Sequence, residues 1–416
     1  MNLLYNLAIA IYAWAIRLAA FFHPKAAQFI KGRHDLFQAL TDFKKVVDSG
    51  TVIWMHCASL GEFEQGRPII EALKKKQPEA TIVLTFFSPS GYEQQKDFPL
   101  ADYVTYLPFD LPEKANRFVA ILQPTLAIFV KYEFWLNHLR ALYHRKIPVV
   151  LISAVFRPQQ IFFRFYGGIF LKELKKFDHL FVQDQNSADL LSRIGINQYT
   201  VAGDTRIDRV ISIAKSARDF PEITTFVAGH QILVCGSTWM GDENILIPFI
   251  NQELPENWKV IIAPHDIREN RIKEIIDRLK ISYQRFSKIN FDQLEESKVL
   301  LIDNIGMLSS LYQYGRLAFI GGGFGVSIHN TLEPMAFHLP VIFGPKFEKF
   351  IEARQMIARE GAFSVTNIDE FRVAFQNLQD QAYYEKTTTT ITQFLHQNSG
   401  SSEQILQYLN AKMLKK

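Results

Sequence analysis

At 416 residues, the chain is longer than one hydrophobic core usually supports, so we expect two domains. A hydrophobic content of 48% with 21% charged residues excludes wholesale disorder, and a net charge of +4 does not by itself indicate a nucleic-acid partner. The two cysteines, Cys57 and Cys235, exclude a zinc-binding spacing and more than one disulfide, which favours a reducing compartment that faces the cytoplasm.

The N-terminal segment is almost entirely apolar over residues 2–22, and three basic residues follow within 25–33. Its length is close to the roughly 20 apolar residues that cross a bilayer. Arg17 would be costly at mid-membrane, so spanning the bilayer and lying in its interface both remain open. The segment lacks the flanks of a signal peptide, and the positive charges after it would leave the rest of the protein in the cytoplasm. We expect residues 1–33 to form a membrane-associated helix.

Strand-like apolar runs alternate with amphipathic helical segments from residue 51 onward. Continuous apolar runs separated by helices indicate a parallel sheet that is covered on both faces. In the first half of the chain, the predicted strands are Thr51–Ala58, Thr81–Phe87, Tyr103–Leu107, Leu126–Val130, Val149–Ala154, His179–Gln183 and Tyr199–Ala202.

A second series of strands begins near Gln231, after a polar segment with few strand signals. Its predicted members are Ile232–Cys235, Lys259–Ala263, Val299–Ile302, Leu317–Ile320 and Val341–Phe343. Two doubly wound α/β units joined in this way place ligands in an interdomain cleft, at the carboxyl ends of the strands. The predicted parts are the N-terminal helix 1–33, a Rossmann-like domain 34–207, a linker 208–230, a second Rossmann-like domain 231–382 and a helical tail 383–416 that packs back across the first domain.

Glu62 lies in the loop Ser59-Leu60-Gly61-Glu62-Phe63, directly after the first strand of the α/β series. A carboxylate on such a loop faces the cleft, where it can remove a proton from a substrate hydroxyl. The structural alternative is that Ser59 caps the following helix and Glu62 completes a capping box. Spacing alone leaves both interpretations open.

Glu133 follows the predicted strand Leu126–Val130 and is therefore a second carboxylate at the same sheet edge. Two acids that converge from strand ends favour an acid–base or charge-stabilising pair. The alternative is a surface carboxylate neutralised by Lys131 or Arg140.

Arg206 ends the run Gly203-Asp204-Thr205-Arg206, after the last strand before the linker. The planar guanidinium binds phosphate through two parallel hydrogen bonds, so Arg206 could hold a phosphate or offset the charge of a leaving group. An ion pair with Asp204 or Asp208 is an equally open alternative.

Four loops after strands of the second domain could line one face of the cleft: Gly236-Ser237-Thr238, Ala263-Pro264-His265, Asn304-Ile305-Gly306-Met307 and Gly321–Gly325. The glycine run lets the backbone approach a phosphate closely. It does not match the dinucleotide or P-loop patterns, which disfavours both enzyme classes. Asn330 and Glu333 open the next helix, where a carboxylate can accept hydrogen bonds from ribose hydroxyls. His265 and His329 are more simply explained as satisfied loop histidines.

The segment 156–177 mixes basic and aromatic residues. This pattern suits an anionic lipid surface, although a core-facing helix with a basic solvent face explains it equally simply.

Together, these motifs resemble the 3-deoxy-D-manno-octulosonic acid (Kdo) transferases of lipopolysaccharide synthesis over almost the whole chain. The most specific piece runs from Gly321 to Gly344 and contains Asn330-Thr331-Leu332-Glu333-Pro334. The resemblance implies a GT-B fold at the cytoplasmic face of the inner membrane. It implies CMP-Kdo as the donor substrate, no separate cofactor and a lipid A precursor, lipid IVA, as the acceptor. The absence of an Asp-x-Asp triplet agrees with metal-independent transfer.

The resemblance also assigns roles to residues. The general base falls on Glu62, and transition-state stabilisation falls on Glu133 and on Arg206, where lysine is more frequent in the family. The implied CMP contacts are Pro264, His265, Ile305, Gly306, Met307, Asn330, Thr331, Leu332 and Glu333. Many members carry an arginine at His265 and an acid at Gly306, so we expect the CMP site to be held differently here. The competing hypotheses are a GT-B enzyme with a UDP-sugar donor and a non-catalytic membrane-bound scaffold.

Overall fold

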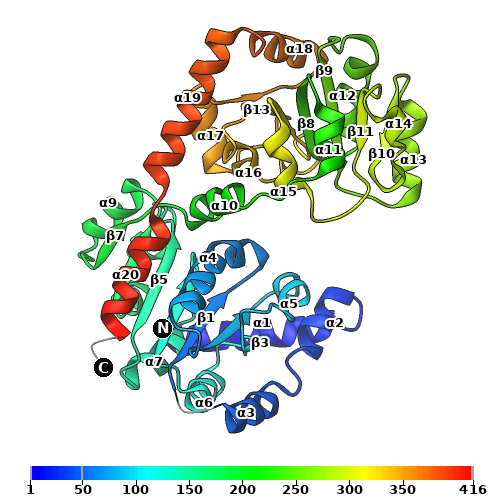
Figure 1. The fold of residues 1–416 in the computed structure, drawn as a ribbon. Coiled ribbons are helices and arrows are strands. Elements are labelled where there is room, and N and C mark those ends of the chain that lie inside the picture. Colours follow the sequence, from blue (N-terminus) through cyan, green and yellow to red (C-terminus); the bar gives the residue numbers. More distant parts are fainter. Residues whose placement is uncertain (1, 48–49, 414–416) are drawn as a thin grey trace. The chain divides into compact units, whose positions relative to one another are not determined.

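The structure, a computed structural model, describes residues 2–47 and 50–413. The chain divides into two compact units (Figure 1). Unit 1 contains Met1–Asp208 together with Asn398–Lys416, and unit 2 contains Arg209–Gln397. Each unit is a doubly wound α/β structure around its own parallel sheet, which confirms the predicted fold class.

The sheet of unit 1 has seven parallel strands in the order β3-β2-β1-β4-β5-β6-β7. Along the central strand β1, Trp54 packs into the core on one face, and Met55 packs into the core on the other. Both faces are therefore covered by apolar side chains, as the continuous apolar runs predict. The strands are β1 (Val52–Cys57), β2 (Thr81–Phe86), β3 (Tyr103–Tyr106), β4 (Leu126–Val130), β5 (Val149–Ala154), β6 (His179–Val182) and β7 (Tyr199–Val201).

Helices cover both faces of this sheet (Figure 1). The C-terminal helix α20 contributes Ile405, Leu406 and Leu409 to the core of unit 1, so the chain's end packs on the first domain as predicted. The helices are α3 (Leu36–Val46), α4 (Leu60–Lys76), α5 (Pro89–Gln95), α6 (Pro112–Leu122), α7 (Leu136–His144), α8 (Gly168–Leu174), α9 (Gln185–Arg193) and α20 (Ser401–Met413), and α10 (Thr205–Lys215) begins at the unit's boundary.

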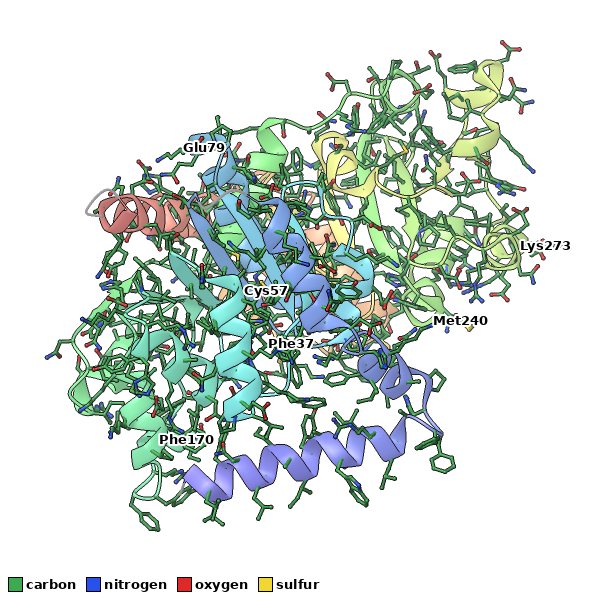
Figure 2. All side chains as sticks on the ribbon, turned by 90° about the horizontal axis from the view of Figure 1, so that it is seen from below. Phe37, Cys57, Glu79, Phe170, Met240 and Lys273 are labelled. Carbon is green, nitrogen blue, oxygen red and sulfur yellow. The ribbon has the colours of Figure 1, made fainter. Side chains whose placement is uncertain are left out.

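The N-terminal segment forms α1 (Asn2–Ala19) and α2 (Pro24–Lys31) on the outside of unit 1 (Figure 2). Tyr5 on α1 donates a hydrogen bond of 2.6 Å to the buried carboxylate of Asp110, and Ala13 is buried against the unit. The opposite side of the segment is apolar and exposed, through Leu3, Leu4, Leu7, Ile11, Trp14, Leu18, Phe21 and Phe22. Within residues 2–47 and 50–413, no helix is both long enough and apolar enough to cross a membrane.

Unit 2 repeats the architecture with the strand order β10-β11-β9-β8-β12-β13-β14. The strands are β8 (Gln231–Thr238), β9 (Trp258–Pro264), β10 (Tyr283–Arg285), β11 (Val299–Leu301), β12 (Leu317–Ile320), β13 (Val341–Phe343) and β14 (Ala362–Ser364). The helices are α11 (Pro221–Val227), α12 (Met240–Gln252), α13 (Glu269–Arg278), α14 (Phe291–Leu294), α15 (Leu308–Leu311), α16 (Leu332–Met335), α17 (Ile351–Ala358), α18 (Ile368–Asn377) and α19 (Gln381–Asn398).

Three local features differ from the sequence-based expectation. The edge strands β10 and β14 were not predicted. The segment 208–230, predicted as a linker, is largely helical because it holds most of α10 and all of α11. The first α/β helix begins at Leu60, so Glu62, which the sequence places in a loop after the strand, lies in the first turn of this helix.

Candidate active site

The topology of unit 1 brings two predicted carboxylates to one place. The chain progresses from β1 to β2 and β3 in one direction and from β4 onward in the other, so the strand order reverses between β1 and β4. Ligands of doubly wound sheets bind at the carboxyl ends of the strands on either side of this reversal. Glu62 follows β1 and Glu133 follows β4, so both belong to this switch point.

Glu62 lies at the N-terminal end of α4, and its carboxylate accepts a hydrogen bond from the hydroxyl of Ser59. Ser59 is the N-cap residue, but its side chain makes no capping hydrogen bond to the helix backbone. The capping-box alternative is therefore wrong, because the hydroxyl is directed to the carboxylate. The positive end of the helix dipole stabilises a negative charge at Glu62.

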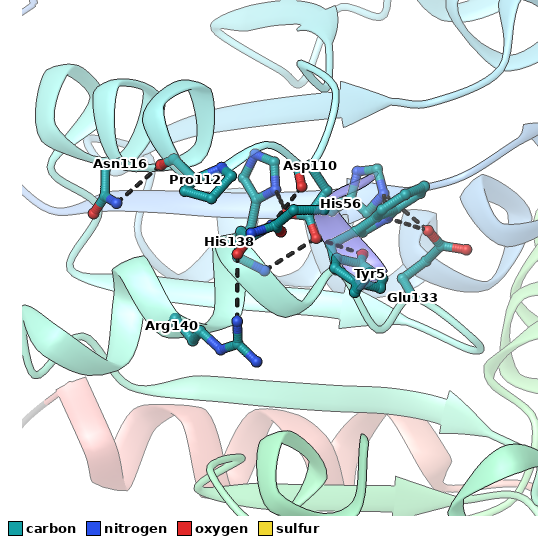
Figure 3. Close-up of polar contacts among 11 residues, drawn as sticks. Tyr5, His56, Asp110, Pro112, Asn116, Glu133, His138 and Arg140 are labelled. Carbon is teal, nitrogen blue, oxygen red and sulfur yellow. Dashed lines mark hydrogen bonds and ion pairs between the residues drawn. The ribbon is translucent and has the colours of Figure 1, made fainter. Parts of the chain in front are cut away.

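Glu133 is held by two aromatic nitrogen groups (Figure 3). Its Oε2 atom lies 2.5 Å from Trp135 Nε1 and 3.2 Å from His56 Nε2. Arg140, one of the two cations considered as partners of Glu133, forms an ion pair with Glu173 at 2.8 Å. Glu133 is thus fixed within the switch point and is only slightly exposed.

Cys57 is the last residue of β1, and the pKa of its buried thiol depends on both carboxylates. Burial raises the pKa of Cys57, and the negative charges of Glu62 and Glu133 raise it further. The two predicted catalytic acids therefore both lie within electrostatic reach of Cys57, at the end of the central strand of unit 1.

Arg206, the third predicted catalytic residue, lies in the first turn of α10 and forms an ion pair with Asp204. Its Nη2 and Nε atoms lie 2.7 Å and 3.0 Å from the same carboxylate oxygen. Burial alone would raise the pKa of Asp204, but the adjacent guanidinium outweighs it and lowers the pKa. Gln65 on α4 also donates to Asp204, at 3.3 Å, which joins the loop of Arg206 to the helix that carries Glu62.

Unit 2 has an equivalent switch point between β8 and β12. The loop after β8 contains Trp239, and the loop after β12 is the glycine run Gly321–Gly325. Asp242, in the first turn of α12, accepts hydrogen bonds of 2.8 Å from the backbone N–H groups of both Trp239 and Gly322. One buried carboxylate therefore holds the two loops together, and burial raises its pKa despite these bonds.

Three aromatic side chains stack at this switch point. The ring of His265, which follows β9, lies 4.5 Å from Trp239 and 4.6 Å from His329 between ring centroids. Trp239 Nε1 also donates to His329 Nε2 at 3.0 Å. Burial and the neighbouring His265 lower the pKa of His329 to about 4. The two histidines are thus parts of one cluster rather than separate loop residues.

The remaining predicted CMP contacts lie on loops of unit 2. Ile305 is exposed, Gly306 has a left-handed backbone with φ of 90°, and Met307 is buried. Asn330 donates to Glu333 at 2.9 Å. Burial raises the pKa of Glu333, although Asn330 and Arg209 act in the opposite direction. Pro264 ends β9, and the backbone of Thr331 and Leu332 opens α16.

The segment 156–177 agrees in part with each of its two interpretations, a core-facing segment and a surface for lipid. Phe156, Phe162 and Phe177 are buried in the core of unit 1. Phe165 and Tyr166 are exposed, at 100% and 55%. Only the tip of the segment therefore offers an apolar surface to a partner.

Sequence reasoning missed the residues that hold the predicted ones. His56, Trp135 and Asp242 make the contacts described above, yet none had been assigned a role. His56 carried a usable signal, because it is a polar residue within an otherwise apolar central strand.

Known proteins resemble the chain at the level of both sequence and fold. A family model described as 3-deoxy-D-manno-octulosonic-acid transferase (Kdo transferase) matches residues 30–209. The 3-deoxy-D-manno-octulosonic acid transferase of Aquifex aeolicus is 29% identical over 326 residues, which cover 76% of this chain and 83% of that protein. The Haemophilus influenzae protein of the same name is 26% identical over 370 residues, which cover 86% of each.

Among solved structures, UDP-GlcNAc 2-epimerase from Neisseria meningitidis matches with a TM-score of 0.59 and 16% identity, over 88% of this chain and 100% of that chain. At this identity the likeness concerns the fold alone, and it confirms the predicted GT-B architecture. The sequence relatives confirm the resemblance that the motifs indicate.

Proposed function

We propose that this chain, which belongs with the Kdo transferases of lipopolysaccharide biosynthesis, transfers Kdo from CMP-Kdo to the lipid A precursor lipid IVA. The family model and the curated relatives support Kdo transfer itself. The donor, the acceptor and the mechanism are the further steps of the proposal. The convergence of Glu62 and Glu133 at one switch point carries the mechanism, because it supplies two carboxylates in different surroundings.

Glu62 is the proposed general base. Its carboxylate removes the proton from a sugar hydroxyl of lipid IVA, and the resulting oxygen attacks the anomeric carbon of Kdo from the face opposite CMP. The new glycosidic bond forms as the bond to the CMP phosphate breaks, so a single displacement inverts the configuration. No metal ion takes part. Glu133 offsets positive charge that develops at the anomeric carbon, and Arg206 offsets negative charge on the departing phosphate.

Unit 2 is the proposed donor-binding unit. Backbone groups of Gly321–Gly325 can approach a phosphate closely, since glycines leave room for it. Glu333 is placed to accept hydrogen bonds from the ribose of CMP. The remaining proposed contacts are made by Pro264, His265, Ile305, Gly306, Met307, Asn330, Thr331 and Leu332.

The proposed location is the cytoplasmic face of the inner membrane, with attachment through the N-terminal segment. The exposed apolar residues of α1 support this, because Leu3, Leu7, Ile11, Trp14 and Leu18 recur at the three- and four-residue spacing of one helix face. A helix with one exposed apolar face can bury that face in the plane of the membrane interface while its other face stays packed on unit 1.

Product analysis tests the proposal directly. The purified full-length protein is incubated with CMP-Kdo and tetra-acylated lipid IVA, and the lipid products are analysed by mass spectrometry. We expect lipid IVA that carries one or more Kdo residues, and we expect CMP rather than UDP to raise the melting temperature. A protein that gives no Kdo-bearing product and is stabilised only by UDP would point to the alternative, a UDP-sugar enzyme.

A further inference from the structure

The side chain of His56 is fully buried and lies between the catalytic edge and the interior of unit 1 (Figure 3). Its Nε2 atom is 3.2 Å from Glu133 Oε2, and its Nδ1 atom is 2.8 Å from the hydroxyl oxygen of Thr85 on β2. That hydroxyl oxygen also accepts a hydrogen bond of 2.8 Å from Trp54 Nε1. The contacts form one chain of polar groups, from Trp54 through Thr85 and His56 to Glu133.

The donors in this chain decide which nitrogen of His56 carries the proton. If Nδ1 carried it, the hydroxyl and the backbone oxygen of Thr85 would be its acceptors, at 2.8 Å and 3.2 Å. The bare Nε2 would then face the carboxylate oxygen of Glu133 at 3.2 Å, and it could accept from Trp135 Nε1 at 3.0 Å only in competition with the shorter contact of 2.5 Å between Trp135 and Glu133. The hydroxyl of Thr85 would then have to donate to the carbonyl of Met55, which is 3.4 Å away, rather than to His56 at 2.8 Å. If Nε2 carries the proton, Trp135 Nε1 keeps its shortest contact, with Glu133 at 2.5 Å, and the Thr85 hydroxyl donates to His56 at 2.8 Å instead of to Met55 at 3.4 Å.

A ring protonated on both nitrogens would leave the Thr85 hydroxyl without His56 as an acceptor, so that its remaining acceptor would be the Met55 carbonyl at 3.4 Å.

We infer that His56 is a positioning residue for Glu133: its neutral ring donates from Nε2 to Glu133 Oε2 and is locked in that tautomer by Thr85. Trp135 supplies the second donor to the same oxygen, at 2.5 Å. Two donors fix the rotamer of Glu133 and occupy Oε2. Glu62 accepts from a single hydroxyl, that of Ser59, so proton removal falls to Glu62 while Glu133 serves as a fixed negative charge.

The role of His56 in turnover rests on the proposed Kdo transfer and is tested by a double-mutant cycle. We expect His56→Asn to lower kcat about tenfold or more in the native background and less than about twofold in a Glu133→Gln background, because a residue that acts through Glu133 has nothing left to position. Melting temperatures identify variants that fail to fold. Equal losses in the two backgrounds would overturn the inference.

Two conservative variants distinguish the contribution to kcat of the nitrogen that faces Glu133 from that of the nitrogen that faces Thr85. The amide nitrogen of Gln reaches the position of Nε2, whereas the amide of Asn reaches only the position of Nδ1. We therefore expect His56→Gln to keep most of kcat and His56→Asn to lose it, with little change in the KM for CMP-Kdo. A ring needed merely to fill the core would give equal losses in both variants, and that result would contradict the assignment.

The tautomer itself is measurable without turnover. In the full-length protein labelled with ¹⁵N-histidine, the resonances absent from His56→Gln identify His56. We expect the chemical shift of a protonated nitrogen at Nε2 and of a bare nitrogen at Nδ1 near neutral pH. The opposite tautomer, or two protonated nitrogens, would overturn the inference. Because this readout needs no substrate, it stands even where Kdo transfer fails, so failure of the proposed function and failure of the inference are distinguishable.

Discussion

Two carboxylates of the same chemical type have different neighbours at this site. Glu62 accepts one hydrogen bond, from a hydroxyl, at the positive end of a helix. Glu133 receives its contacts from two ring nitrogens and is nearly buried. These surroundings agree with the proposed roles, a general base at Glu62 and a fixed negative charge at Glu133.

The first prediction concerns the base. General-base help typically contributes about 10²–10⁴-fold, so we expect Glu62→Gln to lower kcat by at least about 100-fold while the protein folds normally. Kdo transfer under saturating substrates measures the loss, and circular dichroism and the melting temperature check the fold. Glu64→Gln, two residues further along α4, is the matched control and should leave kcat within about threefold of native. Near-normal turnover by the Glu62 variant would rule out the mechanism.

The second prediction concerns Glu333, whose pKa burial raises above the usual value of 4.5. A carboxyl with a raised pKa binds its proton more tightly in the folded protein than in the unfolded chain. Its contribution to the free energy of unfolding therefore decreases as pH rises from about 4.5 through the raised pKa. Glu333→Gln removes this decrease, so we expect a smaller loss of stability between pH 4.5 and 8 by urea unfolding.

The same variant should bind CMP more weakly, by about three- to tenfold, since an amide replaces the charged acceptor proposed for the ribose hydroxyls. Calorimetric titration with CMP checks this part. Asp369→Asn, on the exposed first turn of α18 in the same unit, is the control for a lost carboxylate. Tighter CMP binding by Glu333→Gln, or a steeper fall of stability with pH, would contradict the assignment.

Sequence alone could place the predicted acids but not their partners. Glu62 and Glu133 follow apolar strands, and this pattern fixes the edge of the sheet where they lie. His56 and Thr85 are 29 positions apart, and their contact depends on the lateral register of β1 with β2. The Ser59 contact was ambiguous for another reason, because the same spacing serves a helix cap and a hydroxyl–carboxylate bond.

At the scale of elements, the strands buried inside each sheet were predictable and the outermost strands of unit 2 were not. Each predicted strand has a run of apolar residues in the sequence, because helices pack on both faces of the sheet. The edge strand β10 reads Tyr-Gln-Arg, and β14 spans only Ala362–Ser364. Such edges need few apolar residues, since only one side is paired with another strand.

The third prediction concerns the glycine loop after β12. Gly322 has a φ of 93°, and a Cβ atom there would clash with the carbonyl oxygen of Ser327 and crowd the His329 ring. We expect Gly322→Ala to lower stability by about 1 kcal/mol or more and to weaken CMP binding, because the loop must move. Thermal unfolding and calorimetry measure both effects.

Gly325→Ala is the matched control in the same loop, since its Cβ would meet nothing closer than the Gly322 carbonyl oxygen at 3.4 Å. This variant should stay close to native in stability. Equal effects at the two positions would show that the conformation of Gly322 has no special importance.

At the scale of the molecule, the N-terminal helix has two unlike faces. Tyr5 and Asn6 tie it to unit 1 through hydrogen bonds to Asp110 and Asn137, of 2.6 Å and 2.9 Å. The face that carries Leu7 and Trp14 is exposed. The helix is thus a fixed part of unit 1 that presents an apolar stripe.

The fourth prediction tests that stripe. Each apolar side chain buried in a membrane is worth up to about 1.5–3 kcal/mol, so we expect Leu7→Gln with Trp14→Gln to weaken vesicle binding at least about tenfold. Co-sedimentation with vesicles that contain anionic lipid measures the binding, and the melting temperature should not fall. Val373→Gln, an exposed apolar position on unit 2, is the control. Unchanged binding by the double variant would exclude α1 as the attachment site.

The return of the chain's end to unit 1 has a consequence for biosynthesis. Ile405, Leu406 and Leu409 complete a core whose other members come from residues 53–202, and the backbone N–H groups of Gly400 and Ser402 bond to Asp208 at 2.6 Å. On the ribosome, unit 2 therefore has its whole sequence available before unit 1 does. The core of the half that carries Glu62 therefore remains incomplete until α20 has been synthesised. Cleavage of the chain before α20 would accordingly remove Ile405, Leu406 and Leu409 from the core of unit 1, although unit 2 is the part that precedes the cut.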